Sequence, residues 1–176
     1  MPVPFRLAEP NSLDDVLLYR LSRLLASAGG MVIRLCEGRF GITRREWRIL
    51  ALLAQQEGLL SSQLADRAQL DRARTSKAIT SLVAKKLVER RPKPGDRRQA
   101  ALELTAAGRA LYGELFPLVL EINRELLASL PDPDVGALDQ ALVMLQRRAD
   151  AMVAAAGAGL PRADRSRGAA RKRRAG

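Results

Sequence analysis

One short segment combines small, hydroxyl-bearing and basic side chains in a pattern that suits contact with nucleic acid. If the residues after Asp71 form a helix with about 100° per residue, two opposite faces separate. One face carries Thr75, Ala78, Ile79 and Leu82. Side chains on the other face are small enough for a helix to enter the major groove, where hydroxyl and amino groups reach base edges and phosphates. We therefore predict DNA contacts from this face, the alternative being a solvated surface; its residues are Arg72, Ala73, Arg74, Ser76, Lys77 and Thr80.

Positive charge is concentrated in the same region. Between Arg67 and Arg98, eleven lysines or arginines stand against three acids, so this stretch carries +8 of a chain total of +11. The end segment from Arg162 to Gly176 carries +6, which leaves −3 for the rest of the chain. Charge focused in this way indicates a polyanionic partner. The basic end segment either adds affinity for DNA or is an inert solubilising end.

A hairpin is expected directly after the helix. Two short strands, 87–91 and 100–104, flank the sequence PKPGDRR, which is rich in turn-forming residues. Arg97 and Arg98 at this tip can enter the minor groove, which attracts guanidinium groups. Asp96 repels phosphate, so we expect it to support the tip by pairing with an arginine.

The elements before the helix complete a recognisable order. Thr43 with Glu46 three residues later predicts a capping box and a helix start, and Ser61 or Ser62 caps a short helix that ends near Ala68. The order helix, short helix, turn, helix, hairpin is that of a winged helix-turn-helix. Further candidate phosphate contacts, with simple capping as the alternative, are Ser61, Ser62, Gln63, Thr43 and Arg44.

Longer amphipathic helices are expected on both sides of this domain. The first spans about 14–36, and its Gly29-Gly30 pair predicts a bend or a close packing contact. The second starts after Thr105 and is expected to kink at Pro117, and the third is capped by Asp134. Together they carry more apolar surface than a winged domain of about 60 residues covers. The surplus predicts a helical dimer interface.

The predicted fold class is mainly α with a small β wing. The expected organisation is an N-terminal arm at 1–12, a dimerisation helix at 13–38, a winged helix-turn-helix domain at 39–105, dimerisation helices at 106–156 and a disordered basic tail at 157–176.

Several consecutive motifs resemble those of the MarR family of bacterial regulators. They are SSQLADRAQL for the short helix, LDRARTSKAITSLVAKKLVERR for the following helix and first strand, PGDRR for the hairpin tip, and LTAAGRAL for the next helix. The resemblance spans about residues 13–152. It implies an obligate homodimer, a pseudo-palindromic operator and, in many members, a small-molecule ligand that releases the DNA.

Two features depart from the family's pattern. Lys86 stands where the family usually has glycine, so the end of the DNA-contacting helix lacks a residue that adopts the left-handed conformation freely. The basic segment beyond Arg162 is not part of the family's core pattern.

Trp47 lies on the helix that joins the DNA-binding domain to the dimerisation helices, where the family's ligand pocket commonly lies. Its alternative role is that of a core residue. Arginines beside an aromatic cleft suit a small aromatic carboxylate of the hydroxybenzoate, hydroxycinnamate or hydroxynicotinate type. The candidate ligand-binding residues are Arg20, Ser27, Met31, Trp47, Arg109, Tyr112 and Phe116.

The composition argues against an enzyme. The chain has no histidine, one cysteine and no phosphate-cradling glycine loop, so no catalytic set, metal site or cofactor is expected. Cys36 is expected to be a buried thiol, with redox sensing as the alternative. A single cysteine agrees with a reducing cytoplasm, and neither a signal peptide nor a membrane span is expected.

The leading hypothesis is a cytoplasmic, homodimeric and ligand-responsive transcriptional repressor that binds double-stranded DNA and is released by an aromatic acid. The first alternative is a constitutive or architectural DNA-binding protein without an effector. The second is a redox-sensing regulator that acts through Cys36.

Overall fold

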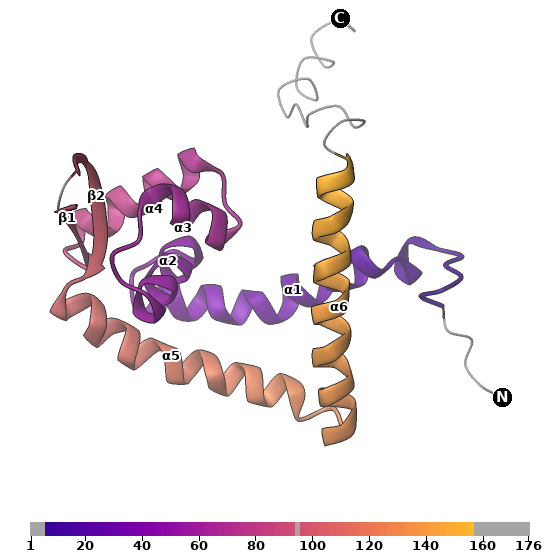
Figure 1. Ribbon diagram of the computed structural model, residues 1–176. Helices are drawn as coiled ribbons and strands as arrows, with labels where there is room; N and C mark the ends of the chain where they lie inside the picture. The colour runs from indigo at the N-terminus through magenta and orange to yellow at the C-terminus, as the bar shows by residue number, and fades with distance from the viewer. Residues whose placement is uncertain (1–5, 94–95, 157–176) are drawn as a thin grey trace, which may run out of the picture. The chain divides into compact units, whose positions relative to one another are not determined.

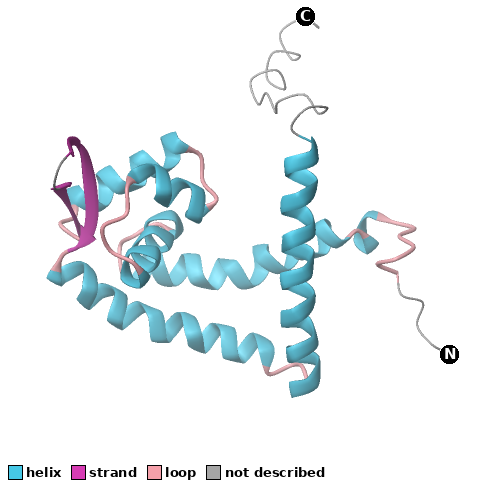
Figure 2. Ribbon diagram, viewed as in Figure 1, coloured by secondary structure: helices cyan, strands magenta, loops and turns pink. Residues whose placement is uncertain are grey.

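The computed structural model describes residues 6–93 and 96–156, and the side chains of residues 93, 96–99 and 156 lie outside that description. The helices are α1 (Leu17–Arg34), α2 (Arg44–Gln55), α3 (Ser61–Ala68), α4 (Arg72–Ala84), α5 (Ala106–Leu127) and α6 (Asp132–Ala156), and the strands are β1 (Val88–Lys93) and β2 (Asp96–Leu104). The chain divides into two compact units, Met1–Leu127 and Ala128–Gly176, of which the second contains α6 (Figure 1). The predicted class, mainly α with a small β wing, is confirmed (Figure 2). The predicted tail at 157–176 lies outside the described residues.

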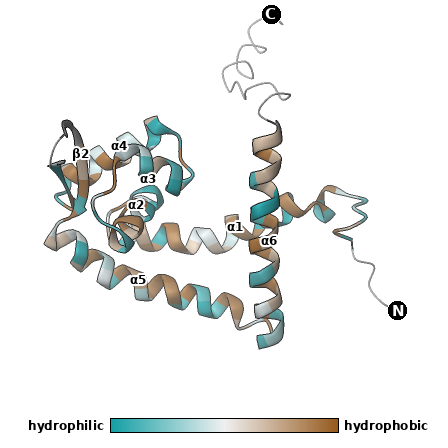
Figure 3. Ribbon diagram, in the orientation of Figure 1, coloured by the Kyte–Doolittle hydropathy of each residue, from teal (hydrophilic) through white to brown (hydrophobic). Residues whose placement is uncertain are grey.

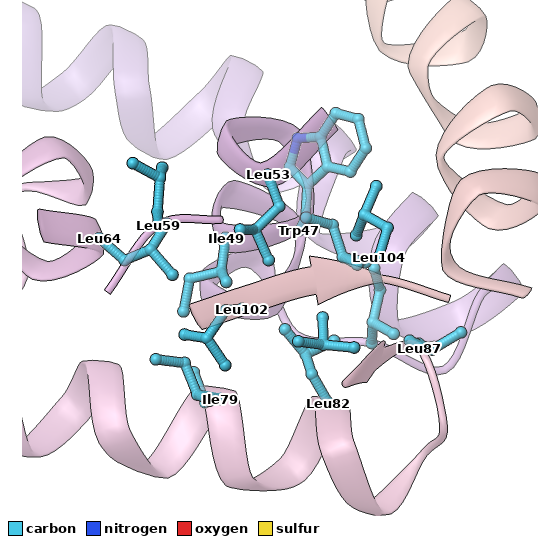
Figure 4. Close-up of a cluster of buried hydrophobic side chains, with 14 of the residues drawn as sticks. Trp47, Ile49, Leu53, Leu59, Leu64, Ile79, Leu82, Leu87, Leu102 and Leu104 are labelled. Carbon is cyan, nitrogen blue, oxygen red and sulfur yellow. The ribbon is translucent and has the colours of Figure 1, made fainter. Parts of the chain in front are cut away.

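The core of the first unit lies between α2, α3, α4 and the strand β2. Leu102 and Leu104 of β2 lie between apolar residues of α2 and α4 (Figure 4). Each side chain buried to this degree contributes about 1.5–3 kcal/mol to folding. The fully buried residues of these elements include Ile49, Leu53, Leu64, Ile79, Leu82, Leu102 and Leu104.

The predicted division of α4 into two faces is confirmed. Thr75, Ala78, Ile79 and Leu82 are buried, whereas the residues of the opposite face are exposed. Asp71 caps the helix, because its carboxylate accepts a hydrogen bond of 2.8 Å from the backbone N–H of Arg74. The hydroxyl of buried Thr75 donates to the carbonyl of Asp71, which satisfies that polar group inside the core.

The wing is longer than the sequence predicted. β1 and β2 pair antiparallel from Val88 opposite Leu104 to Lys93 opposite Asp96, with an irregularity between Pro92 and Lys93. The predicted strand bounds, 87–91 and 100–104, were therefore too short at the ends that face the wing tip. Proline lacks an N–H group, but it is tolerated at the edge of a two-stranded ladder. Leu59 adds a bridge to Leu102, so the chain before α3 contributes a minimal third strand.

The end of α4 contains a left-handed lysine. Lys86 has a φ of 58°, so this residue adopts the left-handed conformation that glycine adopts most freely. The N–H of Lys86 donates to the carbonyl of Val83 (2.9 Å), and the N–H of Leu87 donates to that of Leu82 (3.0 Å). This pair of bonds is a Schellman motif, and with the burial of Leu87 it offsets a conformational cost of about 1–2 kcal/mol.

The outer helices differ in detail from the predicted ranges. α1 begins at Leu17 rather than at 14, because Leu13–Asp15 form a 3-10 turn and Val16 is extended. A π-helical turn, Leu35–Arg39, follows α1. α6 begins at Asp132 rather than after Asp134, because the carbonyl of Pro131 accepts hydrogen bonds from the N–H groups of the first turn.

Two predicted features of these helices are confirmed. Gly29 is a close packing position, since an added Cβ would lie 3.3 Å from the Nη1 atom of Arg44 on α2. Thr105 caps α5, because its hydroxyl accepts a hydrogen bond from the N–H of Gly108. α5 continues as helix through Pro117.

Exposed apolar residues lie along α1, α5 and α6. In Figure 3, the ribbon is brown at the hydrophobic positions of these helices. Leu18 of α1 is 75% exposed, and Met144 and Val153 of α6 are 69% and 74% exposed. Surfaces of this kind are typical of helices that pack against a partner. No helix in the ranges 6–93 and 96–156 combines the length and apolar character required to cross a membrane.

Candidate nucleic-acid interface and effector cavity

The outward face of α4 gathers the residues that the sequence predicted to contact DNA. Ala73, Ser76, Lys77 and Thr80 are exposed along this face, and Arg72 is exposed in the first turn. Arg74 is also exposed, but its Nε atom lies 3.0 Å from the Oδ2 atom of Asp71. The cap residue therefore holds Arg74 and neutralises part of its charge. A helix with one buried apolar face and this outward face has the form that major-groove reading requires.

The first turn of α3 carries the predicted phosphate contacts Ser61, Ser62 and Gln63, all of them exposed. The N-cap residue is Leu60 and not a serine. The backbone N–H of Leu60 donates a hydrogen bond of 2.8 Å to the side-chain oxygen of Gln63. The prediction that Ser61 or Ser62 caps α3 was therefore wrong. Both serines lie instead in the first helical turn, where backbone N–H groups point outward and can bind phosphate.

Thr43 is a capping residue. Its hydroxyl accepts from the N–H of Glu46, and the Glu46 carboxylate accepts from the N–H of Thr43, so the predicted capping box is confirmed. Glu46 is buried and also receives hydrogen bonds of 3.0 Å from the Nζ atom of Lys85. These hydrogen bonds tie the N-terminus of α2 to the C-terminal end of α4. They therefore hold α4 in place against α2.

The backbone of Asp96, Arg97 and Arg98 belongs to β2, and their side chains lie outside the described part of the structure. Their roles at the wing tip remain predictions. Arg91, which the sequence did not single out, is held in the ladder: Nη2 lies 2.7 Å from Glu89, and Nε lies 3.1 Å from Glu103. The hydrogen bond to Glu89 and the charge of Glu103 raise the pKa of Arg91.

Three aromatic rings form a stack between α2 and α5. Trp47 is 8% exposed, and its ring centroid lies 5.6 Å from that of Tyr112. The ring of Phe116 lies 5.1 Å from Tyr112 and 6.3 Å from Trp47. Such contacts add about 0.5–1.5 kcal/mol per pair beyond burial of area. Trp47 is therefore a core residue whose ring packs against Tyr112 and Phe116 of α5.

A cavity of about 370 Å³, here called the apolar cavity, lies between α1, α2 and α5. It is large enough for a small aromatic molecule. Its polar wall residues are Arg44, Arg48 and Asn123. The other lining residues are Leu25, Ala28, Gly29, Val32, Trp47, Ala51, Val119, Ile122 and Leu126.

Of the seven predicted ligand-binding residues, Trp47 alone lines this cavity. Tyr112 and Phe116 stack beside Trp47. Arg109 pairs instead with Glu57. Successive rotations of 100° per residue place Arg20, Ser27 and Met31 of α1 opposite the helix face that lines the cavity, and all three are exposed.

Arg48 was missed by sequence reasoning, and Arg44 was considered only as a phosphate contact. Arg44, Trp47, Arg48 and Ala51 follow the spacing i, i+3, i+4 and i+7, so they share one face of α2. This spacing was available in the sequence and would have identified both arginines as neighbours of Trp47.

Cys36 is fully buried, as the sequence predicted. Burial raises the pKa of its thiol, and Glu37 adds to this effect. Reactive cysteines have a lowered pKa and access to solvent, so the surroundings of Cys36 favour an inert thiol.

Comparisons with known proteins agree with this geometry. Residues 40–99 match the model described as the MarR family. A putative transcriptional regulatory protein for the hcr operon of Thauera aromatica is 30% identical over 108 residues, which are 61% of this chain and 65% of that relative. The chain thus spans slightly less than two thirds of that relative's length.

Two solved structures have the same fold. A MarR/EmrR family transcriptional regulator from Acinetobacter sp. ADP1 has a TM-score of 0.73 at 24% identity, covering 79% of this chain and 98% of its own. CouR from Rhodococcus jostii RHA1, solved with p-coumaroyl-CoA, has a TM-score of 0.67 at 26% identity, covering 75% and 92%. Residues 40–99 therefore resemble the MarR family, and the described fold, with α4 and the wing, is that of a solved MarR/EmrR family regulator.

Proposed function

We propose that the protein is a homodimeric, ligand-responsive transcriptional regulator that represses its targets by binding a pseudo-palindromic operator. The observation that carries this proposal is α4, whose inner face is buried and whose outward face presents small, hydroxyl-bearing and basic side chains. Dimerisation would place two such helices in successive major grooves, about 34 Å apart. The exposed apolar residues of α1, α5 and α6 support a helical dimer interface.

The effector that we propose is a small aromatic acid or its thioester. The apolar cavity supports this class, because Trp47 offers a flat apolar wall and Arg44 and Arg48 offer guanidinium groups for a carboxylate. The solved complex of the neighbour CouR with p-coumaroyl-CoA adds an aromatic thioester as a ligand of the same fold. Binding in this cavity would favour one spacing of the two α4 helices and so change the affinity for DNA.

Selection of bound sequences from a random DNA pool, followed by footprinting on genomic DNA, tests the proposal. We expect a site with two related half-sites one helical turn apart, bound by a dimer in analytical ultracentrifugation. Binding without sequence preference would favour the architectural alternative. Selective operator binding that no aromatic acid or thioester weakens would favour a constitutive regulator.

A further inference from the structure

A second cavity, of about 390 Å³, is bordered by the start of α2 and the turn before α4, and we call it the arginine cavity. Four arginines contribute to its wall, and Glu37 is the one acid among its lining residues. The wall therefore carries four guanidinium groups against a single carboxylate. The complete lining is Ile33, Glu37, Thr43, Arg44, Arg45, Arg48, Leu70 and Arg74.

Most of this positive charge is not balanced within the described part of the chain. Arg74 pairs with Asp71, but Arg44 and Arg45 make no hydrogen bond or ion pair with any described residue. Arg48 donates a hydrogen bond of 2.6 Å to the carbonyl of Ala68, which is not a charged group. Burial lowers the pKa of Arg48, and the charge of Arg44 lowers it further. Like charges held together in this way are stabilised by a bound anion.

The position of the cavity suits an anion for a second reason. The N-terminus of α2 is the positive end of a 12-residue helix, and the N–H groups of its first turn have no partner within the helix. Glu46 lies at the same helix end, but its carboxylate is already engaged by Thr43 and Lys85. The arginines therefore dominate the charge that faces the cavity.

The arginine cavity lies between two surfaces that the proposed function employs. A smaller hollow of about 250 Å³ shares Thr43, Arg45 and Arg74 with it and extends to Lys77 on the outward face of α4. Arg44 and Arg48 line both the arginine cavity and the apolar cavity. A group bound among these arginines would thus be next to the DNA-facing helix and next to the effector.

We propose that the arginine cavity is a binding site for a phosphate group. Guanidinium groups match phosphate with paired, charge-assisted hydrogen bonds, and a helix N-terminus adds backbone N–H donors. The phosphate comes from the DNA backbone or from a phosphate-bearing small molecule, and the choice between these two sources rests on the proposed function. The site itself rests on the cavity and its unbalanced arginines.

Arg45 offers the cleanest test, because it lines the arginine cavity and not the apolar cavity, and because it has no described partner whose loss would disturb folding. Arg45→Gln removes one positive charge. Arg124→Gln is the matched control, since Arg124 is exposed on α5 and lines neither cavity. Thermal unfolding of both variants verifies that the fold is retained.

The first arm titrates the full chain and both variants with inorganic pyrophosphate by calorimetry. We expect saturable binding that Arg45→Gln weakens about tenfold and that Arg124→Gln leaves unchanged. This arm requires no DNA, so its result is independent of the proposed function. The second arm measures binding to a mixed-sequence 30-base-pair duplex as a function of salt concentration.

If the DNA backbone is the source, Arg45→Gln lowers the slope of log affinity against log salt by about 0.9, and Arg124→Gln does not. Pyrophosphate binding that depends on Arg45 together with an unchanged slope identifies a small molecule as the source. An Arg45→Gln variant that equals the control in both arms overturns the proposal. If the full chain binds no DNA, the proposed function is contradicted. The dependence of pyrophosphate binding on Arg45 then decides by itself whether the arginine cavity binds phosphate.

Discussion

Gly108 of α5 lies directly against the backbone of Leu87. A Cβ atom added at Gly108 would be 2.0 Å from the carbonyl oxygen of Leu87, and the same oxygen accepts a hydrogen bond of 3.1 Å from the N–H of Thr105. The start of α5 is therefore packed onto the segment that joins α4 to the wing. Only a residue without a side chain permits this approach, so the contact fixes α4 and the wing against α5, the first helix that follows them.

Gly108→Ala is expected to destabilise the protein by at least about 1–3 kcal/mol, because the Leu87 carbonyl must move and its hydrogen bond to Thr105 is strained. Denaturant unfolding measures this change. Gly113→Ala is the matched control, since Gly113 lies in the same helix with open space around it. That control is expected to gain about 0.5–1 kcal/mol from helix propensity. Equal effects at both positions would contradict the close approach.

Lys86→Gly is expected to stabilise the protein by about 1 kcal/mol, because glycine adopts the φ of 58° at this position without steric cost. Lys86→Ala separates conformation from charge, since it removes the ammonium group and keeps a Cβ atom. The stabilisation should appear in the glycine variant and be absent from the alanine variant in thermal unfolding. A loss of stability in Lys86→Gly would argue against the left-handed helix end.

Glu46 should make stability depend on pH. Burial alone would raise its pKa, but hydrogen bonds from Ser81, Thr43 and Lys85 outweigh burial and hold the pKa below the ordinary value of 4.5. The folded state therefore binds this proton less readily than the unfolded state. The contribution to stability is present above the unfolded pKa and is lost as the pH falls through the folded pKa.

Glu46→Gln is accordingly expected to reduce the free energy of unfolding by about 1–3 kcal/mol at neutral pH and to flatten its decline as the pH falls from neutral to below the ordinary pKa of 4.5. Denaturant unfolding across this range measures both effects. Glu125→Gln, at an exposed position of α5, is the control. A wild-type and a Glu46→Gln profile that run parallel would show that this carboxylate has no lowered pKa.

Arg97→Ala is expected to weaken operator binding at least about tenfold while leaving the dimer intact, because a wing arginine would be lost from the DNA interface and not from the helices. Gel-shift titration at fixed salt gives the affinity, and ultracentrifugation gives the oligomeric state. Arg124→Ala on α5 controls for net charge. An unchanged affinity would remove the wing from the proposed interface.

p-Coumarate is expected to quench Trp47 fluorescence and weaken operator binding, because the apolar cavity brings a ligand against the indole ring. Arg44→Gln should reduce this affinity about tenfold through loss of a charge-assisted hydrogen bond. Arg20→Gln should leave it unchanged, since Arg20 is exposed on the opposite face of α1. If Arg20→Gln weakened p-coumarate binding and Arg44→Gln did not, the result would favour the pocket expected from the sequence over the apolar cavity.

The sequence alone determined the order of elements and the two faces of α4, because both depend on interactions within a few residues. The 100° rotation per residue separated Ser76 and Lys77 from Ile79 and Leu82, and the spacing of Thr43 and Glu46 specified a capping box. Charge patterning pointed to the same segment. Each of these features follows from local geometry that any fold must respect.

Tertiary structure decided which side chains share a cavity and which charges remain unbalanced. Arg44 and Arg48 meet Val119 and Asn123 only because α5 packs across α1 and α2, whereas Arg91 is neutralised by Glu103 from the neighbouring strand. The left-handed Lys86 is maintained by its helix-end bonds and by burial of Leu87. These outcomes depend on contacts between residues far apart in the chain, so no periodicity within one helix could have specified them.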